Sequence, residues 1–360
     1  MSTLSITNTA TFQRATTRSR DPDKAKMFEF LYCDIAIDLG TANILIYSKR
    51  NGIVVNEPSI VAFNSHGQPV AIGSEALSVH ERTHGGIRTV RPLRHGVIAD
   101  FETAEHMMVG MIKHVKKNWY ARTRKMVVCV PSGITDVERR AVRDSAHHAG
   151  ARKVYLVDEP MAAAIGIGFD IHDHEGNMVV DIGGGTTEIA VIALSGVIHA
   201  QSVRLAGDVI NESIADYIRG HHNLLIGQRT AEKIKFQIGS AAPLDQELEM
   251  TIKGRDLVRG IPVARNINSV EIRKAISDPV NTIVDSIIKS LDQTPPEFSA
   301  DLLDRGIYLA GGGALLKNLD QLITDRTGLA VHIAEDPLTA VVRGTGIVLD
   351  DLDFYRGVLS

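Results

Sequence analysis

Two stretches of the chain repeat one pattern: an apolar run ends in aspartate, a turn of glycine and small polar residues follows, and a second apolar run begins. They are IAIDLGTANILIY at residues 35–47 and VVDIGGGTTEIAVI at residues 179–192. Glycine weakens the interior of a strand, so its presence here points to a need other than strand stability. The pattern predicts two related strand–turn–strand hairpins and an internal duplication, in a chain of the α/β class.

The two turns are suited to binding an anion. Glycine and small residues let backbone N–H groups approach a phosphate with no Cβ in the way. Asp38 and Asp181 end the first strand of each hairpin. We expect them to hold Mg²⁺ through water, because this cation keeps several waters and prefers carboxylate and phosphate oxygens. Two such hairpins facing each other across a cleft would clamp a polyphosphate from both sides.

A third glycine turn, AGGGALL, contains Gly311, Gly312 and Gly313 and is predicted to follow a strand and open a helix. A helix N-terminus offers unpaired N–H groups and the positive end of the helix dipole. Ordinary tight turns use the same residue types, so one hairpin alone would not identify a phosphate site, but two matched copies and a third turn favour it. The sequence has neither a G-x-x-x-x-G-K-[ST] loop nor a helix-opening G-x-G-x-x-G, which disfavours the two commonest nucleotide folds.

Local signals predict further elements. Thr135 and Glu138 form a capping box at the start of a helix that Gly150 ends, with a small-residue face that includes Val137 and Ala141. Helices are expected over residues 268–276 and 278–294, and hairpin character is expected within 240–267.

Composition and charge limit the function classes. The formal net charge of −4 gives no reason to expect a nucleic-acid partner. No apolar stretch of the sequence reaches the ~18 to 20 residues that span a bilayer. Cys33 and Cys129 lie in apolar strand-like runs, and we interpret both as buried, reduced thiols. Residues 1–26 are rich in serine and threonine and lack periodicity, so they are predicted to be a disordered leader.

Several motifs together resemble the bacterial actin homologues of the MreB/Mbl family. They occur in order between about residues 28 and 350: DLGTAN, DEPMAAAIG, VVDIGGGTTE, TAEKIKFQIGSA, LAGGGALLKNLD and AEDPLTAV. The resemblance implies an actin-like fold, with two related ribonuclease-H-like domains around a central nucleotide cleft. The implied division is domain I at 27–172 with a small subdomain at about 56–92, domain II at 173–350 with a small subdomain at about 208–275, and a tail at 351–360.

The resemblance also implies ATP and Mg²⁺ as ligands. It places the first phosphate loop at residues 41–43, the second at 183–186, adenosine contacts on a helix around 232–235, and a closing loop at 312–315. The full set of nucleotide-binding residues predicted is Thr41, Ala42, Asn43, Gly183, Gly184, Gly185, Thr186, Gly207, Asp208, Glu232, Lys233, Ile234, Lys235, Gly311, Gly312, Gly313, Ala314 and Leu315.

Two catalytic roles follow from the same resemblance. Glu159 would polarise the water that attacks the γ-phosphate, and Thr186 would help to position it; an oriented water matters more to this reaction than a strong base. The alternative for Glu159 is a solvated acid in a turn. Asp158 stands where most relatives have glutamate, and Asn211 where aspartate is common, which leaves a ribose contact near Asn211 open.

Two surface predictions concern partners. Trp119 and Tyr120 lie between basic residues in KHVKKNWYARTRK, which suits an anionic membrane surface; the alternative is a solvated loop whose tryptophan packs into the core. The resemblance implies filaments, and Val137 and Ala141 are candidates for a lateral, antiparallel contact between paired filaments. The alternative is that this helix face is buried within its own domain.

The function implied is that of a bacterial actin. ATP-bound subunits would form filaments at the inner face of the cytoplasmic membrane, with weak ATP hydrolysis coupled to their turnover. With cell-wall elongation proteins as partners, the filaments would organise peptidoglycan synthesis and maintain rod shape. The alternatives are a sugar-kinase-type phosphotransferase of the same superfamily and a chaperone-type ATPase.

Overall fold

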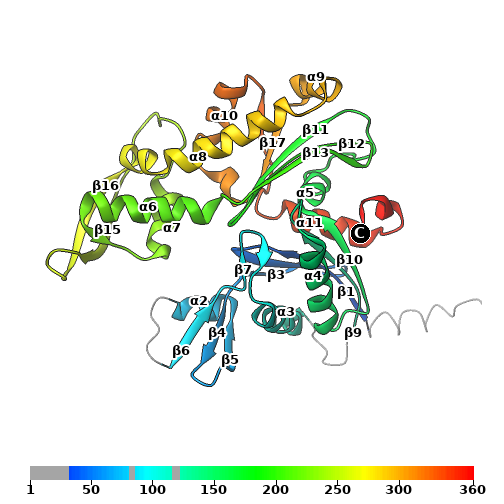
Figure 1. Cartoon of the computed structure of the whole chain (residues 1–360), viewed down its shortest axis with the longest axis horizontal. Coiled ribbons are helices and arrows are strands. Elements are labelled where there is room, and N and C mark those ends of the chain that lie inside the picture. Colours follow the sequence, from blue (N-terminus) through cyan, green and yellow to red (C-terminus); the bar gives the residue numbers. More distant parts are fainter. Residues whose placement is uncertain (1–31, 81–85, 116–121) are drawn as a thin grey trace, which may run out of the picture.

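The computed structural model describes residues 32–80, 86–115 and 122–360, and two five-stranded sheets form its centre (Figure 1). The predicted leader and the pair Trp119 and Tyr120 lie outside the described residues. The first sheet has the order β10-β9-β1-β2-β3, with strands β1 (Tyr32–Leu39), β2 (Asn43–Ser48), β3 (Gly52–Pro58), β9 (Arg122–Val130) and β10 (Lys153–Asp158).

The second sheet repeats this arrangement. Its order is β13-β12-β11-β17-β18, with strands β11 (Asn177–Ile182), β12 (Thr187–Ala193), β13 (Gly196–Val203), β17 (Ile307–Ala310) and β18 (Val331–Ile333). In each sheet the first three strands in sequence form an antiparallel meander, and the two later strands continue the sheet in parallel from the first. The two sheets share one strand order and one set of strand directions, as expected from the internal duplication that the paired hairpins predicted.

Smaller sheets extend from each half. β4 (Val61–Asn64), β5 (Pro69–Ile72) and β6 (Ile87–Val90) lie with helix α2 (Gly73–Val79) on one side of the molecule, and β7 (Leu93–Arg94) pairs with β8 (Val97–Ile98) (Figure 1). On the other half, β15 (Glu249–Asp256) and β16 (Pro262–Asn268) form the hairpin expected within residues 240–267, and β14 (Leu224–Leu225), which was not expected, pairs with β15. The boundaries predicted for the domains and subdomains stay predictions.

Helices cover the sheets and join the two halves. They are α3 (Phe101–Val115), α4 (Asp136–His148), α5 (Glu159–Ile167), α6 (Gly207–His222), α7 (Gln228–Ile238), α8 (Ser269–Asp292), α9 (Pro296–Arg305), α10 (Leu319–Thr327) and α11 (Ala340–Asp350), with short 3₁₀ helices η1 (Gly312–Leu315) and η2 (Phe354–Val358). No helix within the described ranges has both the length and the apolar character that crossing a bilayer requires.

Two helices show where local signals succeed and fail. The capping box of α4 is confirmed: the Thr135 hydroxyl accepts from the Glu138 N–H, and the Glu138 carboxylate accepts from the Thr135 N–H. The predicted break before Pro279 is wrong, because α8 runs through it. Pro279 removes one backbone hydrogen bond, but Ile276, Val280 and other apolar residues on that face are buried and hold the helix together.

Helices α5 and α11 cross between the two sheets at a pair of glycines (Figure 1). A Cβ on Gly166 would overlap the Ala340 carbonyl, and one on Gly344 would overlap the Ala162 carbonyl, so the backbones touch directly. Helix α11 also packs on β1 and β9. The chain therefore returns to the first sheet near its C-terminus.

Candidate functional site

The first hairpin, β1–β2, brings Asp38 to the edge of its sheet. Asp38 is the penultimate residue of β1, and in the parallel register with β9 it lies beside Cys129. Side chains at the carboxyl ends of parallel strands gather at one edge. The turn is held by Ser59, whose hydroxyl donates to the Gly40 carbonyl at 2.7 Å and whose N–H donates to the Ala42 carbonyl at 2.9 Å.

The second hairpin, β11–β12, places Asp181 in the equivalent position. Asp181 is opposite Glu188 in the antiparallel register, so both carboxylates lie on one face of the hairpin. The turn closes through its own backbone, where the Gly183 N–H donates to the Thr186 carbonyl at 2.9 Å. Its carbonyls accept from the start of α6: Gly207 N–H donates to Gly183 at 3.2 Å, and Asp208 N–H donates to Gly184 at 2.8 Å.

The two glycine turns face and touch each other. A Cβ on Gly184 would lie 2.7 Å from the Ala42 Cβ, and a Cβ on Gly185 would lie 2.6 Å from the Thr41 Oγ1. No real Cβ tolerates such distances, so glycine is required where the loops meet. The two predicted hairpins therefore face each other in the structure, but residues 41–42 contact residues 184–185 directly and not across a cleft.

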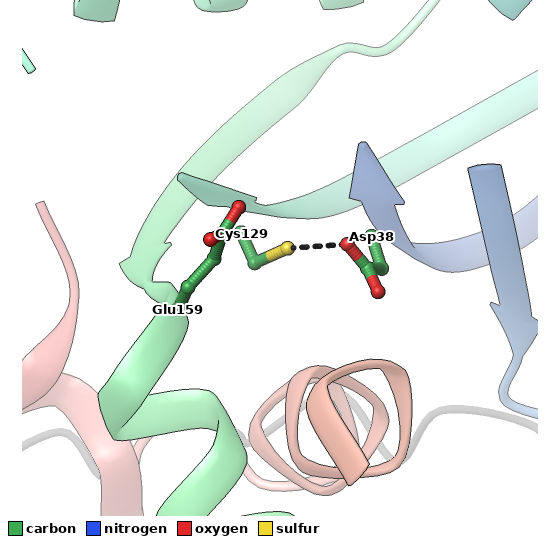
Figure 2. A group of neighbouring side chains, drawn as sticks. All are labelled: Asp38, Cys129 and Glu159. Atoms are coloured by element: carbon green, nitrogen blue, oxygen red, sulfur yellow. Dashed lines mark hydrogen bonds between the residues drawn. The ribbon is translucent and has the colours of Figure 1, made fainter. Parts of the chain in front are cut away.

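A group of carboxylates, of which Asp38 is half-buried and the others are buried, lies beside the loops. Figure 2 shows Asp38, Cys129 and Glu159, whose oxygen and sulfur atoms lie within 4.8 Å of one another. The Cys129 thiol donates to Asp38 Oδ1 at 3.3 Å. Glu159 is the first residue of α5 and is only 8% exposed, so it is not a solvated acid in a turn.

The carboxylates raise one another's pKa values. Burial raises the pKa of Asp38 to about 6 and that of Asp181 to about 7, the latter helped by repulsion from Asp38 and Glu188. Burial also raises the pKa of Glu159 well above its usual range, and four neighbouring carboxylates add to the shift. Such a group of acids with upward-shifted pKa values is typical of a site built for a cation.

The residues present fit Mg²⁺ with a polyphosphate. Asp38, Asp181 and Glu159 offer hard oxygen ligands. The Cys129 side chain offers sulfur and not oxygen, and burial raises the pKa of this thiol well above its usual range. The buried Asn211 Oδ1 has no hydrogen-bond partner among the described residues, which leaves an unpaired acceptor in the first turns of α6.

The predicted adenosine helix, α7, meets the second loop through Lys235. Its ammonium donates to the Gly207 carbonyl at 3.1 Å, and burial lowers its pKa. Glu232 and Lys233 are exposed, while the Ile234 side chain lies in the hydrophobic core. Burial raises the pKa of Asp208, although Arg91 and Lys235 oppose the shift.

The third glycine turn packs against the second hairpin. A Cβ on Gly311, whose φ is +77°, would overlap Asp181 Oδ1, and one on Gly313 would overlap the Ile182 side chain. The predicted helix does not begin directly after the strand: Gly312–Leu315 form a short 3₁₀ helix, and α10 starts at Leu319. The closing loop thus lies next to the Asp181 carboxylate.

Sequence reasoning missed three contributors to the site. Cys129 is a buried free thiol as predicted, whereas Cys33 is only partly buried; what the sequence did not reveal is that Cys129 lies in β9 beside Asp38, within the carboxylate group. Glu188 accepts from the Ser132 N–H at 3.1 Å and from the Ser202 hydroxyl at 2.5 Å. The turn at Gly96 donates its N–H to Thr41 Oγ1 at 2.9 Å. The order of parallel strands could have revealed Cys129, whereas the other two contacts depend on packing between distant elements.

The candidate filament residues lie on α4. Val137 is 76% exposed, and Ala141 is half-buried, whereas Val142 and Ser145 are buried. The alternative that the whole face is buried within the fold therefore does not hold for Val137.

Comparisons with known proteins give consistent results. The family model described as MreB/Mbl protein matches residues 32–356. The chain is 50% identical over 332 residues to the cell shape-determining protein MreB of Escherichia coli (strain K12), covering 91% of this chain and 96% of the relative. It is 45% identical over 321 residues to the cell shape-determining protein Mbl of Bacillus subtilis (strain 168), covering 89% and 96%.

A solved structure agrees with these relatives. The crystal structure of MreB 5 of Spiroplasma citri bound to AMPPNP superposes with a TM-score of 0.86 at 38% identity, covering 90% of this chain and 97% of that one. The actin-like α/β fold expected from the sequence is thereby confirmed.

Proposed function

The chain belongs to the MreB/Mbl family, and from this premise we propose that it binds ATP between its two hairpins and hydrolyses it slowly while assembling into filaments. The observation that carries the proposal is the meeting of two glycine loops beside the half-buried Asp38 and the buried carboxylates Asp181 and Glu159. Support comes from the Spiroplasma citri relative, which was crystallised with AMPPNP.

The loops account for phosphate binding. The carbonyls of Gly183 and Gly184 accept hydrogen bonds from the start of α6, and the turn would bind the phosphate through its backbone N–H groups. Thr186, buried at the end of this loop, would help to position the attacking water. When bound, Mg²⁺ would neutralise phosphate charge, with Asp38 and Asp181 holding it through water.

Glu159 would orient the attacking water. Its carboxylate is held at the N-terminus of α5 and points to the group formed by Asp38 and Cys129 (Figure 2). Burial, with repulsion from neighbouring carboxylates, raises the pKa of Glu159 well above its usual range in the free protein. A nearby cation would lower that pKa again, so Glu159 could accept a hydrogen bond from water in the nucleotide complex.

The proposed cellular role follows the relatives that are named as cell shape-determining proteins. Paired filaments would form with Val137 and Ala141 at a lateral contact, and Trp119 and Tyr120 would contact the inner face of the cytoplasmic membrane. There the filaments would organise peptidoglycan synthesis with cell-wall elongation proteins and maintain rod shape. ATP-dependent pelleting with and without liposomes tests assembly and membrane binding; phosphorylation of an added sugar without pelleting would favour the kinase alternative instead.

The chemistry is tested with Glu159→Ala. We expect ATP affinity in magnesium buffer to stay within about threefold, while phosphate release falls by about 100-fold, as for loss of a water-positioning group. Asp158→Asn is the matched control, because Asp158 is the adjacent acid and pairs with Arg139 at 3.7 Å; its rate should change little. Unchanged hydrolysis in Glu159→Ala would remove this role, and no calorimetric ATP binding by the wild type would overturn the whole proposal.

A further inference from the structure

Glu188 ties the two halves of the molecule together beside the glycine turns. It lies in β12, shortly after Thr186, and is only 1% exposed. Its Oε1 accepts from the Ser202 hydroxyl of β13 at 2.5 Å, a contact within the second sheet. Its Oε2 accepts from the Ser132 N–H at 3.1 Å, and Ser132 belongs to the connection between β9 and α4. One buried side chain therefore joins the second hairpin to that connection.

The two hydrogen bonds are what makes this buried acid tolerable. A buried carboxylate is costly unless it accepts hydrogen bonds. Burial raises the pKa of Glu188 to about 7, and the bonds from Ser202 and Ser132 oppose the rise. Glu188 also lies opposite Asp181 in the hairpin, so it moves with that hairpin as a unit. A displacement of β12 that keeps Glu188 buried must carry the Ser132 N–H with it.

The surroundings of this bond are loosely filled. An open cavity of about 480 Å³ lies beside it, between the β9–α4 connection on one side and Ser202 and Arg204 on the other. Among the described residues, Ser132 and Glu188 are the one hydrogen-bonded pair that joins residues 131–138 to β12 or β13. Close packing would spread a displacement over many contacts. Here the hydrogen bond carries most of it.

The connection leads directly into α4, the helix with the candidate filament contact. Ser132 comes shortly before the N-cap Thr135, whose capping box with Glu138 fixes the first turn of the helix. Val137, which is 76% exposed, lies in that first turn. A displacement of Ser132 therefore moves the start of α4, and Val137 moves with it.

We infer that Glu188 is a positioning residue through which the second glycine turn sets the position of α4. ATP bound at residues 183–186 holds β12 in place, and the bond from Ser132 to Glu188 then holds the start of α4 in the position that lateral contact needs. Coupling of this kind is reciprocal, so lateral contact raises ATP affinity by the same factor as ATP raises lateral affinity. The nucleotide end of this coupling rests on the proposed function.

Two neutral replacements separate the hydrogen bond from the charge. Glu188→Gln keeps an oxygen that accepts from the Ser132 N–H, whereas Glu188→Met has a similar length and no such acceptor. Hydrogen–deuterium exchange of residues 131–139 is followed in the full chain with and without saturating Mg²⁺–ATP, at a protein concentration at which nothing pellets. ATP should slow this exchange by about fivefold in the wild type and nearly as much in Glu188→Gln, but by less than about twofold in Glu188→Met.

Two serine variants test the same bond without touching the acid. Ser202→Ala removes the hydrogen bond that orients the Glu188 carboxylate, and it should lose about half of the ATP-dependent slowing. Ser132→Ala is the matched control, because it retains the N–H that donates to Glu188 and should respond to ATP as the wild type does. This pair decides the question if Glu188→Met does not fold: an equal response in the two serine variants overturns the inference.

Calorimetry on the same samples separates this inference from the proposed function. No ATP binding by the wild type overturns the proposed function, and the coupling falls with it. ATP binding with unchanged exchange at residues 131–139 overturns the coupling alone, and so does full slowing in Glu188→Met. Slowing that is kept in Glu188→Gln and lost in Glu188→Met supports the coupling, since both variants lack the charge and differ in the hydrogen bond.

Discussion

The two hairpins have the same strand order but hold their turns in different ways. In the first hairpin, side chains hold the turn: the Thr41 hydroxyl accepts from the Gly96 N–H, and the Ser59 hydroxyl donates to the Gly40 carbonyl. In the second, the backbone suffices, with Gly183 bonding to Thr186 and the start of α6 bonding to the turn carbonyls. The β11 and β12 strands are also buried throughout, whereas β2 and β3 carry exposed positions.

This difference shows how a duplicated unit forms one site. The first turn supplies the Cβ of Ala42 and the hydroxyl of Thr41, and the second supplies the space into which they fit, at Gly184 and Gly185. Identical turns would either collide or leave a gap. Two of the three glycines of the second turn, Gly184 and Gly185, therefore serve the contact between the hairpins.

The contact between the turns is most directly broken by Gly184→Val. The nearest atom, the Ala42 Cβ, would be 2.7 Å from the new Cβ, so the turns must separate. We expect ATP affinity in magnesium buffer to fall by about 1,000-fold, which corresponds to roughly 4 kcal/mol. Isothermal titration calorimetry measures this loss.

Two further variants make the result specific. Adding Ala42→Gly to Gly184→Val removes the nearest clashing atom and should recover about tenfold in affinity. Gly220→Ala, in an open position of α6 where a Cβ meets nothing within 4 Å, should bind ATP as the wild type does. Wild-type affinity in Gly184→Val would show that the turns do not act together.

The sequence predicted the duplicated hairpins, the turns and the acids Asp38 and Asp181, because these follow from short-range pattern and from residue chemistry. It did not predict that Cys129 lies beside Asp38, since the apolar run of β9 does not itself show which strand it pairs with. The sequence also did not predict that Ala42 fits against Gly184, because this contact depends on how two hairpins that are distant in sequence approach each other. The predicted break before Pro279 was wrong, because burial of one face of α8 outweighs the backbone hydrogen bond that the proline removes.

The two aspartates should differ in their effect on stability. Burial raises the pKa of Asp181 to about 7 and that of Asp38 to about 6, from 3.8 in each case. Between pH 4 and 7 the folded chain thus binds more protons than the unfolded chain, so these groups lower the free energy of unfolding as pH rises. At pH 8, without metal or nucleotide, Asp181→Asn should be more stable than the wild type by about 2 to 3 kcal/mol.

Asp38→Asn is the matched comparison. Its gain at pH 8 should be smaller, because its pKa is shifted less, and both gains should vanish near pH 4, where the wild-type carboxyls are protonated in the folded state. Urea unfolding at the two pH values measures the differences. Equal gains in the two variants would contradict the assignment of the more buried acid to the second hairpin. So would a wild type that gains stability relative to both variants between pH 5 and 8.

The smallest expected effect tests whether the first turn depends on its side chains. Thr41→Val keeps the shape of a buried residue but leaves the Gly96 N–H without its acceptor at 2.9 Å. Since Gly96 is only partly buried, water replaces some of the lost bond, and the cost should be about 1 kcal/mol in the urea unfolding of the nucleotide-free protein. Thr41→Ser retains the hydroxyl and should lose less than half as much. If the two variants are equally destabilised, the Thr41 methyl rather than its hydroxyl holds the turn, and the contrast between a side-chain-held and a backbone-held hairpin fails at this position.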